Sequence, residues 1–297
     1  MSENQLPNPA DPGSAESFRR PFLMSVGFIG AAVAFTFLGG RGEEANGKPP
    51  LGRTWKSSEL VSLDAIDHAA WDELLRDYVD GQGLVDYKRW KASSEDVAKL
   101  DGYLDELSRG STQVEAGREA RLAFWINAYN AVTVKGILQV YPTTSIRNHT
   151  AKVVGYNIWN DLPLRVGGEG FSLNDIEHKI LRKMGEPRIH FAIVCASIGC
   201  PRLLNEAYVS GRLEEQLAGN ATHFFAQPQN FRFDAQQNKV YLSSILEWFG
   251  KDFGPTKAAV LQKVAPLLPS GEARAAALSD GVSVAYLDYD WNLNQQN

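Results

Sequence analysis

The stretch REARLAFWINAYNAVTVKGILQV, residues 118–140, decides the fold of this chain. Its apolar side chains occupy nearly every side of a helix, whereas a surface helix concentrates them in one stripe. We therefore expect a central buried helix. Three polar residues interrupt the apolar surface, and Asn127, Asn130 and Thr133 recur at every third position along one face.

The two asparagines admit two interpretations. A buried amide must be hydrogen-bonded, because an unpaired one costs about 1–3 kcal/mol. In the first interpretation Asn127 and Asn130 satisfy the backbone of nearby loops. In the second they line a pocket and contact a ligand.

Shorter elements surround this helix in the sequence. An amphipathic helix is expected over 64–79, and a second helix begins at Ser94. Ser172 and Asp175 resemble a capping box, which predicts the start of a helix over 173–184. The other expected elements are strands at 153–159, 164–166 and 282–288, a hairpin of 231–233 with 240–242, and helices over 210–225, after Ser243 and after Pro255.

The stretch IHFAIVCASIGCP, residues 189–201, holds both cysteines and one of the five histidines. Both faces of 189–196 are largely apolar, which predicts an interior strand. Helices and strands are interspersed along the chain without strict alternation. We therefore expect an α+β fold, with one domain in which the central helix packs on a mixed sheet.

The two cysteines leave several possibilities open. Cys200 follows the predicted strand, where a thiol can act as a nucleophile if His178 or His190 serves as its base. A disulfide between Cys195 and Cys200 requires a sharp turn and suits an exported protein. Two inert buried thiols are the third possibility. A zinc site completed by His178, His190 or His223 lacks a second cysteine pair or a close histidine pair, so we predict no metal.

A second polar cluster falls on the predicted helix 173–184. His178 and Arg182 are four residues apart and share one face. Glu177 lies on the side of the leucines, and a buried carboxylate needs a partner. The cluster is either a salt-bridge network or, together with the two asparagines, a substrate-binding site.

The N-terminal region has the sequence pattern of a targeting signal. Residues 1–20 are polar and rich in proline, which predicts a disordered tail. Two arginines precede 21–40, which has no charge and is long enough to cross a membrane. This arrangement keeps the tail cytoplasmic and exports the rest. We expect a single-pass inner-membrane anchor or a twin-arginine-like signal, a linker over 41–60 and an extracytoplasmic domain over 61–297.

Composition narrows the function classes. The chain has 297 residues, of which 44% are hydrophobic and 22% charged, with a net charge of −5. A nucleic-acid-binding protein would carry a basic patch and a high isoelectric point, so we expect no nucleic-acid partner for this chain. The sequence has no phosphate loop, dinucleotide fingerprint, G-x-S-x-G or H-E-x-x-H motif, and no cofactor is expected. The expected partners are the membrane, through residues 21–40, and an unidentified small-molecule, peptide or glycan ligand.

Four motifs in order carry a family resemblance: FWINAYNA (124–131), DIEHKILR (175–182), HFAIVCASIGCPRL (190–203) and YDWNLN (289–294). Over about residues 64–294 the chain resembles the uncharacterised domain family numbered 547, found in bacteria and in plant proteins with a leucine-zipper region. The recurring polar positions that the resemblance implies are Asn127, Asn130, Glu177, His178, Arg182, His190, Cys195 and Cys200.

The order of the elements is also remotely similar to papain-like and transglutaminase-like folds. Those families place a nucleophilic cysteine at the start of the helix, where this chain has Asn127. Two functional hypotheses follow. One is a thiol-dependent hydrolase or acyl transferase on an envelope substrate, with Cys200 as nucleophile, His178 or His190 as base and an asparagine amide stabilising the oxyanion. The other is a non-catalytic binding or scaffold domain with a structural disulfide.

Overall fold

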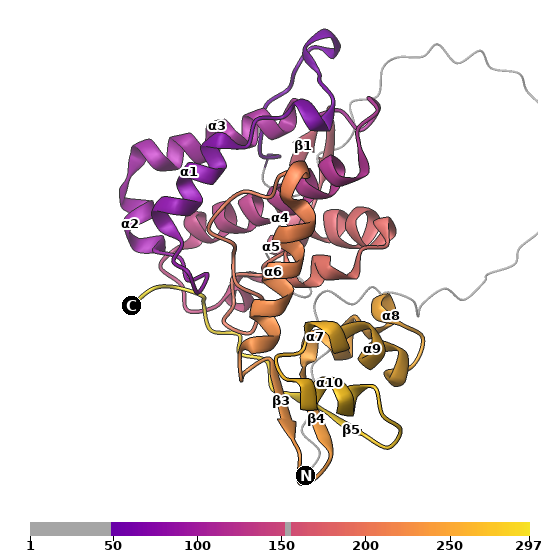
Figure 1. The fold of residues 1–297 in the computed structure, drawn as a ribbon. Helices are drawn as coiled ribbons and strands as arrows, with labels where there is room; N and C mark the ends of the chain where they lie inside the picture. Colours follow the sequence, from indigo (N-terminus) through magenta and orange to yellow (C-terminus); the bar gives the residue numbers. More distant parts are fainter. Residues whose placement is uncertain (1–48, 152–155) are drawn as a thin grey trace, which may run out of the picture. The chain divides into compact units, whose positions relative to one another are not determined.

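The computed structural model describes residues 49–151 and 156–297 (Figure 1). The predicted tail, the predicted membrane span and residues 41–48 of the predicted linker lie outside these residues. Within the described part, no helix is both long enough and apolar enough to cross a membrane. The last residues of the predicted linker contact the domain, since the Leu51 N–H donates to the Pro163 carbonyl at 2.8 Å.

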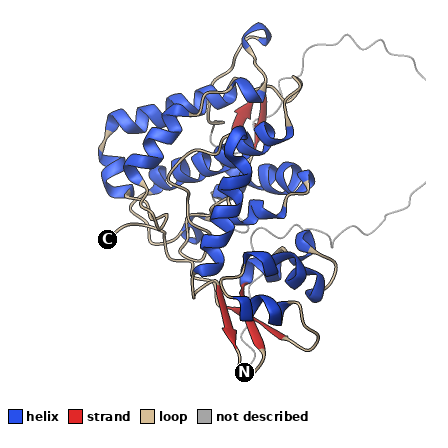
Figure 2. Cartoon of the chain, viewed as in Figure 1, coloured by secondary structure: helices blue, strands red, loops and turns tan. Residues whose placement is uncertain are grey.

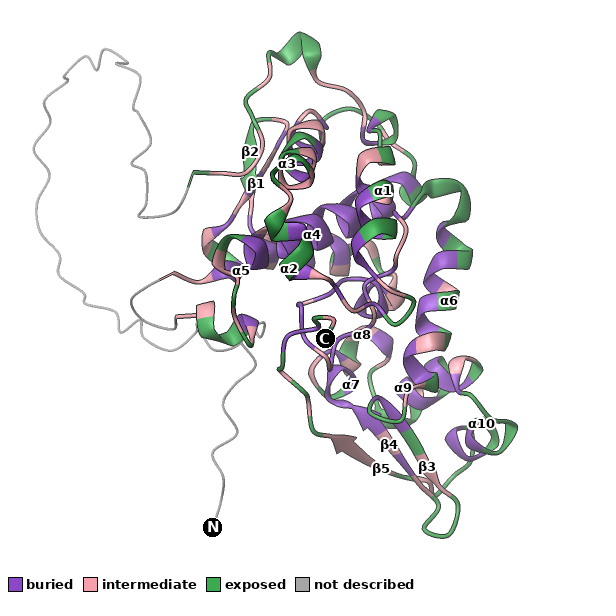
Figure 3. Cartoon of the chain, turned by 90° about the vertical axis from the view of Figure 1, so that its left-hand side faces the viewer, coloured by how far each residue is buried: buried purple, intermediate pink, exposed green. Residues whose placement is uncertain are grey.

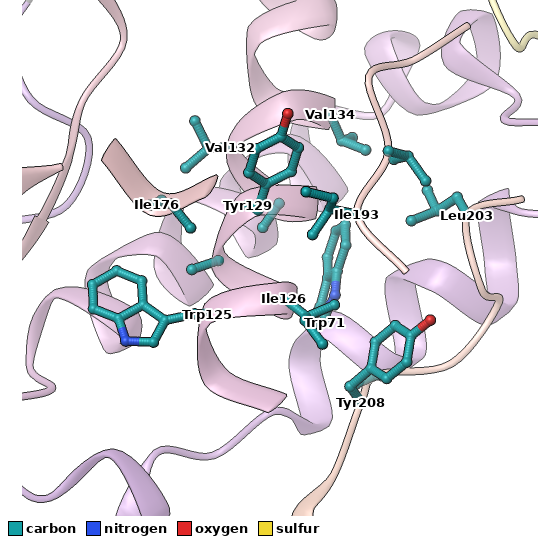
Figure 4. Close-up of a cluster of buried hydrophobic side chains, with 14 of the residues drawn as sticks. Trp71, Trp125, Ile126, Tyr129, Val132, Val134, Ile176, Ile193, Leu203 and Tyr208 are labelled. Atoms are coloured by element: carbon teal, nitrogen blue, oxygen red, sulfur yellow. The ribbon is translucent and has the colours of Figure 1, made fainter. Parts of the chain in front are cut away.

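Helix α4 (Arg118–Val140) forms the centre of the fold, with the bounds that the sequence predicts. It is buried along most of its length (Figure 3). Helices α2 (Tyr87–Ala92) and α3 (Ser94–Ser108) pack against it, and α1 (Ala69–Tyr78) packs on α3. Figure 4 shows side chains of α4 lying beside Ile176 and Ile193, which come from the segments that cover its other side.

Two small sheets accompany the helices (Figure 2). Strands β1 (Leu164–Val166) and β2 (Glu169–Phe171) form a hairpin whose turn residues, Gly167 and Gly168, have φ of 59° and 93°. Such values favour glycine and match a tight hairpin turn. The second sheet has the order β3-β4-β5, and its strands are Phe231–Asp234, Lys239–Ser243 and Ser283–Leu287.

The pairing of β4 is antiparallel to β3 and parallel to β5, so this sheet is mixed, and the α+β class is confirmed. The expectation that the central helix packs on the mixed sheet is wrong. The main neighbours of α4 are α2, α3 and helical turns. A helix that is apolar on all sides needs cover on all sides, which flanking helices provide better than one short sheet.

The C-terminal half contains the remaining helices. The helices over 213–226, 244–248 and 257–264 lie within a few residues of predicted ones, whereas the sequence pattern does not predict those over 250–253 and 271–277. Ser243 caps the helix over 244–248 by accepting a hydrogen bond from the Ile245 N–H. The bounds are α6 Leu213–Ala226, α7 Ser244–Trp248, α8 Gly250–Phe253, α9 Lys257–Val264 and α10 Gly271–Ala277. Short 3-10 turns are η2 Ser57–Glu59, η3 Leu63–Ala65, η4 Ile146–His149, η8 Ser210–Arg212 and η9 Ala265–Leu267.

The predicted strand over 189–196 is wrong. The chain forms the 3-10 helix η7 (Pro187–Phe191) and then an irregular buried segment. A short apolar run does not distinguish a strand from another buried conformation. Side-chain amides replace the missing sheet partner, because Asn130 and Asn220 both bond to the backbone of this segment. These amides therefore pair several of its buried peptide groups without a ladder.

Two further predictions near the site need correction. The capping box at Ser172 and Asp175 is present, but the helix that it opens becomes the π-helix η5 (Asp175–Leu181) and then the 3-10 helix η6 (Arg182–Met184). A π-helical segment is rare and often marks a functional site. The strand predicted over 153–159 ends instead in helix α5 (Ile158–Asp161), and 152–155 lie outside the described residues.

Candidate functional site

The asparagines of α4 hold two irregular segments in place. Asn127 donates to the Tyr208 carbonyl at 2.8 Å and accepts from the Tyr208 N–H at 2.9 Å. Asn130 donates to the Ala192 carbonyl at 3.0 Å and accepts from the Val194 N–H at 2.9 Å. Both amides are buried, and each uses its oxygen and its nitrogen on backbone groups. This geometry is that of the first interpretation, in which the amides satisfy loop backbone.

The two cysteines are joined in a disulfide, with their Cα atoms 6.3 Å apart. Cys195 follows the irregular segment and is half-buried, whereas Cys200 is 8% exposed. Ala196 adopts φ of 57°, a left-handed conformation that turns the chain sharply between them. Neither sulfur carries a thiol in this state, so nucleophilic chemistry at Cys200 first requires reduction.

Two hydroxyl groups contact the disulfide. The Tyr289 hydroxyl lies 3.0 Å from each sulfur, and the Ser197 hydroxyl lies 2.9 Å from the Cys195 sulfur. The Ser197 hydroxyl also donates to the Tyr289 oxygen at 3.0 Å. Burial raises the pKa of Tyr289, so the phenol keeps its proton and remains a donor.

The C-terminal segment, residues 289–294, brings Tyr289 to this position. The N–H groups of Ile198 and Gly199 donate to carbonyls of this segment, each at 2.8 Å. A Cβ atom at Gly199 would lie 2.9 Å from the backbone nitrogen of Asp290, so only glycine allows this approach. The YDWNLN motif therefore docks on the disulfide loop.

Glu177 is a buried carboxyl group next to this loop. It is 6% exposed, and its oxygen accepts a hydrogen bond from the Tyr129 hydroxyl at 3.2 Å. Burial raises the pKa of Glu177 to about 7, although Tyr129 and the Arg182 charge act in the opposite direction. A carboxyl group with a pKa near neutrality can exchange a proton at physiological pH, which is a property of many functional sites.

Asp252 contacts two cationic or ionisable side chains, and a third joins them through Arg182. Arg182 forms a bidentate ion pair with it, at 2.6 and 2.9 Å, and His190 Nε2 lies 2.8 Å from the same carboxylate. His178 Nδ1 lies 3.0 Å from the Arg182 guanidinium. Burial alone would raise the pKa of Asp252, but the hydrogen bonds of His190 and Arg182 hold it far below its usual value. Burial lowers the pKa of His190 in spite of the carboxylate.

Aromatic rings link this polar network to the C-terminal segment. His190 stacks on Phe249, with ring centroids 4.3 Å apart, and His178 lies 6.3 Å from the same ring. The neighbouring Trp248 packs against Tyr289 and Trp291, at centroid distances of 4.9 and 5.9 Å. We refer to Trp248, Tyr289 and Trp291 as the aromatic group. All three members are half-buried.

The wall of a separate cavity includes Cys200. This cavity, of about 250 Å³, also borders Arg202 and Asn230, and the histidine beside it is His223 on α6. Gln227, directly after the last residue of α6, contacts His223 at 3.3 Å. We refer to this space as the Cys200 cavity. Neither His178 nor His190 lines it.

The sequence-predicted residues thus fall into separate groups. Glu177, His178, Arg182 and His190 share one polar network, and Asn127 and Asn130 act on loop backbone next to it. The cysteines form a third group, and no described contact joins them to His178 or His190. Within the described residues, no cluster of three or more histidine, cysteine or carboxylate side chains could hold a metal ion.

Sequence reasoning missed Asp252 and Tyr129, which complete the polar network. Asp252 lies 62 residues from His190 on the four-residue helix α8, and such a distance leaves no spacing signal. Asn220 was missed as well, although a polar residue on the apolar side of α6 is a sign of a buried hydrogen-bonding role. It donates to the carbonyls of Phe191 and Arg202.

Comparison with known proteins identifies part of the chain. Residues 114–225 match the model of a family described as "Protein of unknown function, DUF547". These residues form a DUF547 domain. The match includes three of the four motifs, and the YDWNLN motif lies beyond it. No curated protein and no solved structure matches the chain.

Proposed function

We propose that this chain is a membrane-anchored, extracytoplasmic DUF547 protein that binds an envelope glycan without catalysing a reaction on it. In this proposal the disulfide and the buried amides are structural, and they hold the binding residues in position. The ligand contacts the aromatic group and the polar side chains beside it.

The aromatic group is the observation that carries the proposal. Trp248, Tyr289 and Trp291 are half-buried rings in mutual contact, and Arg147 lies 5.2 Å from the Trp291 ring. Sugar rings pack their apolar C–H faces on such rings, while nearby polar groups bind their hydroxyls. Phe249 follows Trp248 in the chain and lies 6.3 Å from the His178 ring, so the polar network begins one residue from the aromatic group.

The predicted catalytic residues already make structural interactions, which supports a non-catalytic role. The amides of Asn127 and Asn130 are used on backbone groups, and His190 is buried between Phe249 and Asp252. The Cys200 sulfur is bonded to that of Cys195. A group that already makes its full set of interactions is a poor candidate for attack, proton transfer or oxyanion stabilisation.

Intrinsic tryptophan fluorescence tests the glycan proposal, with a β-1,4-linked N-acetylglucosamine tetramer as the probe and the full chain in detergent. Trp248→Ala and Trp291→Ala should each weaken binding by about threefold to tenfold, since an aromatic contact contributes about 0.5–1.5 kcal/mol. Trp55→Ala is the matched control, because Trp55 is also half-buried but contacts Arg53 and Ser108. The absence of saturable binding up to about 5 mM, or equal loss in all three variants, contradicts the proposal.

The membrane location has its own test. The uncharged run over 21–40, preceded by two arginines, supports an anchor with the DUF547 domain on the extracytoplasmic side. Deletion of residues 1–40 should move the protein from the membrane fraction to the soluble fraction of the expressing cell. Protease added to intact spheroplasts should digest the full-length domain, and protection from that protease contradicts the proposed orientation.

A thiol-dependent hydrolase or acyl transferase is the second candidate. One observation favours it, namely that Cys200 and His223 line the same cavity. The nucleophile would be Cys200 after reduction, with His223 in place of the predicted His178 or His190 as the base. In this case the reduced protein should hydrolyse p-nitrophenyl acetate, and Cys200→Ala should abolish that activity. Activity that survives Cys200→Ala excludes it.

A further inference from the structure

The Cys200 cavity has the composition of a site for a small anion. Among the described residues that line it, Arg202 is the cation and there is no acidic side chain. Arg202 uses Nε on Asn220 and Nη1 on the Gly81 carbonyl. Its Nη2 makes no hydrogen bond within the described part of the chain, so two N–H donors remain for a ligand.

A second donor lies in the same wall. Asn230 lines the cavity, and its side-chain amide makes no hydrogen bond to the described residues. The unused N–H groups of Arg202 and Asn230 therefore border one space that a small molecule can enter. A carboxylate fits Arg202 and Asn230, because both supply N–H donors.

The position of the disulfide adds a reactive group to this site. Cys200 lines the cavity, whereas Cys195 does not. A nucleophile that enters the cavity therefore approaches Cys200 before Cys195, and the Cys195 sulfur is then the leaving group. The Tyr289 hydroxyl lies 3.0 Å from each sulfur, so it can donate to whichever sulfur becomes the thiolate. Such a donor lowers the pKa of a leaving thiol, and a leaving group of lower pKa departs faster. The choice of Cys200 as the point of attack rests on the cavity and not on this hydroxyl.

We propose that the Cys200 cavity binds small carboxylate-bearing thiols and that they reduce the Cys195–Cys200 disulfide by attack on Cys200. The thiolate forms a bond to the Cys200 sulfur, and the electron pair of the broken sulfur–sulfur bond goes to Cys195, which takes a proton from water. A second thiolate attacks the ligand sulfur of the mixed disulfide and releases Cys200 as a thiolate, which also takes a proton. Two thiols are thereby oxidised to one disulfide, and the protein disulfide is reduced to two thiols.

The experiment compares two probes on the oxidised full-length chain in detergent. One is 3-mercaptopropionate, which carries a carboxylate, and the other is 2-mercaptoethanol, which is neutral. Acid quenching, alkylation with N-ethylmaleimide and mass spectrometry give the rate of reduction and the cysteine that carries the adduct. Rates are compared at equal thiolate concentration, so that the intrinsic reactivity of the two thiols does not decide the result.

The charged thiol should react at least about tenfold faster than the neutral one, because its carboxylate forms charge-assisted hydrogen bonds with Arg202 that the neutral thiol cannot form. Arg202→Gln should remove this preference, and the matched control Arg232→Gln, at an exposed position on β3, should keep it. Asn230→Asp is a second variant that leaves Arg202 and its hydrogen bonds in place. It should slow only the charged thiol, because the new carboxylate repels it.

The adduct should be found on Cys200. Equal rates for the two thiols in the wild-type chain, or an adduct on Cys195, overturn the proposal. The outcome does not depend on glycan binding, which is measured at the aromatic group with the protein oxidised. The second functional candidate, in contrast, needs this reduction before Cys200 can act.

Discussion

Replacement of Asn130 by alanine should destabilise the domain strongly. The substitution removes the donor to the Ala192 carbonyl and the acceptor for the Val194 N–H, and both backbone groups are in buried residues. Each buried group left without a partner costs about 1–3 kcal/mol, so the free energy of unfolding should fall by about 2–6 kcal/mol. In a domain of this size, 1 kcal/mol shifts Tm by about 2–4 °C. The lower bound therefore corresponds to a decrease in Tm of about 4–8 °C.

Thermal unfolding followed by circular dichroism measures this change, and Asn148→Ala is the matched control. Asn148 is exposed, and its amide contacts only threonine hydroxyls at 3.3 Å. Its replacement should change stability by less than about 0.5 kcal/mol. A Tm for Asn130→Ala within 1 °C of the wild-type value would refute the reasoning, because it would mean that the segment after η7 does not depend on this amide.

Three other changes have defined outcomes. Burial raises the pKa of Glu177 to about 7, so the native state binds the carboxyl proton more tightly than the unfolded state does. The free energy of unfolding should therefore fall as pH rises from about 4.5 to 7. Urea titrations should show the wild type losing up to about 3 kcal/mol over this range relative to Glu177→Gln. Loss of the disulfide in a Cys195→Ala/Cys200→Ala double variant should cost about 2 kcal/mol, the value for so short a loop, and an unchanged urea midpoint would contradict this. Gly199→Ala should speed hydrogen exchange in residues 289–294, because its methyl group collides with that segment, whereas Gly219→Ala, which faces open space, should not.

The sequence predicts the centre of the fold well. The bounds of α4 follow from a long apolar run that ends before Pro142, and the hairpin of β3 and β4 follows from alternation around polar turn residues. These elements depend on local pattern. The irregular segment after η7 does not, because its conformation depends on amides from α4 and α6, which are distant in sequence. The apolar residues of this segment therefore predict its burial correctly, but they wrongly predict a strand.

The candidate site shows the same contrast between features that local sequence pattern predicts and contacts that it does not. The sequence indicates that Glu177, His178 and Arg182 belong together, since one predicted helix, over 173–184, carries all three. It does not indicate that Asp252 joins Arg182 to His190, because that contact spans 70 and 62 residues. Nor does it show that Cys200 shares a cavity with His223. Contacts between distant elements are set by packing, which no local spacing encodes.

The state of the two cysteines decides most directly between a binding domain and a thiol enzyme. The measurement is alkylation mass spectrometry on the full chain, purified from the cell envelope without reductant and exposed to iodoacetamide across pH 5 to 9. The structure leads us to expect no alkylation of Cys195 or Cys200 until a reductant is added, and equal alkylation of both afterwards in denaturant. Rapid alkylation of Cys200 in the native, unreduced protein would contradict the account, because it would show a free and reactive thiol where a disulfide is proposed to hold the site.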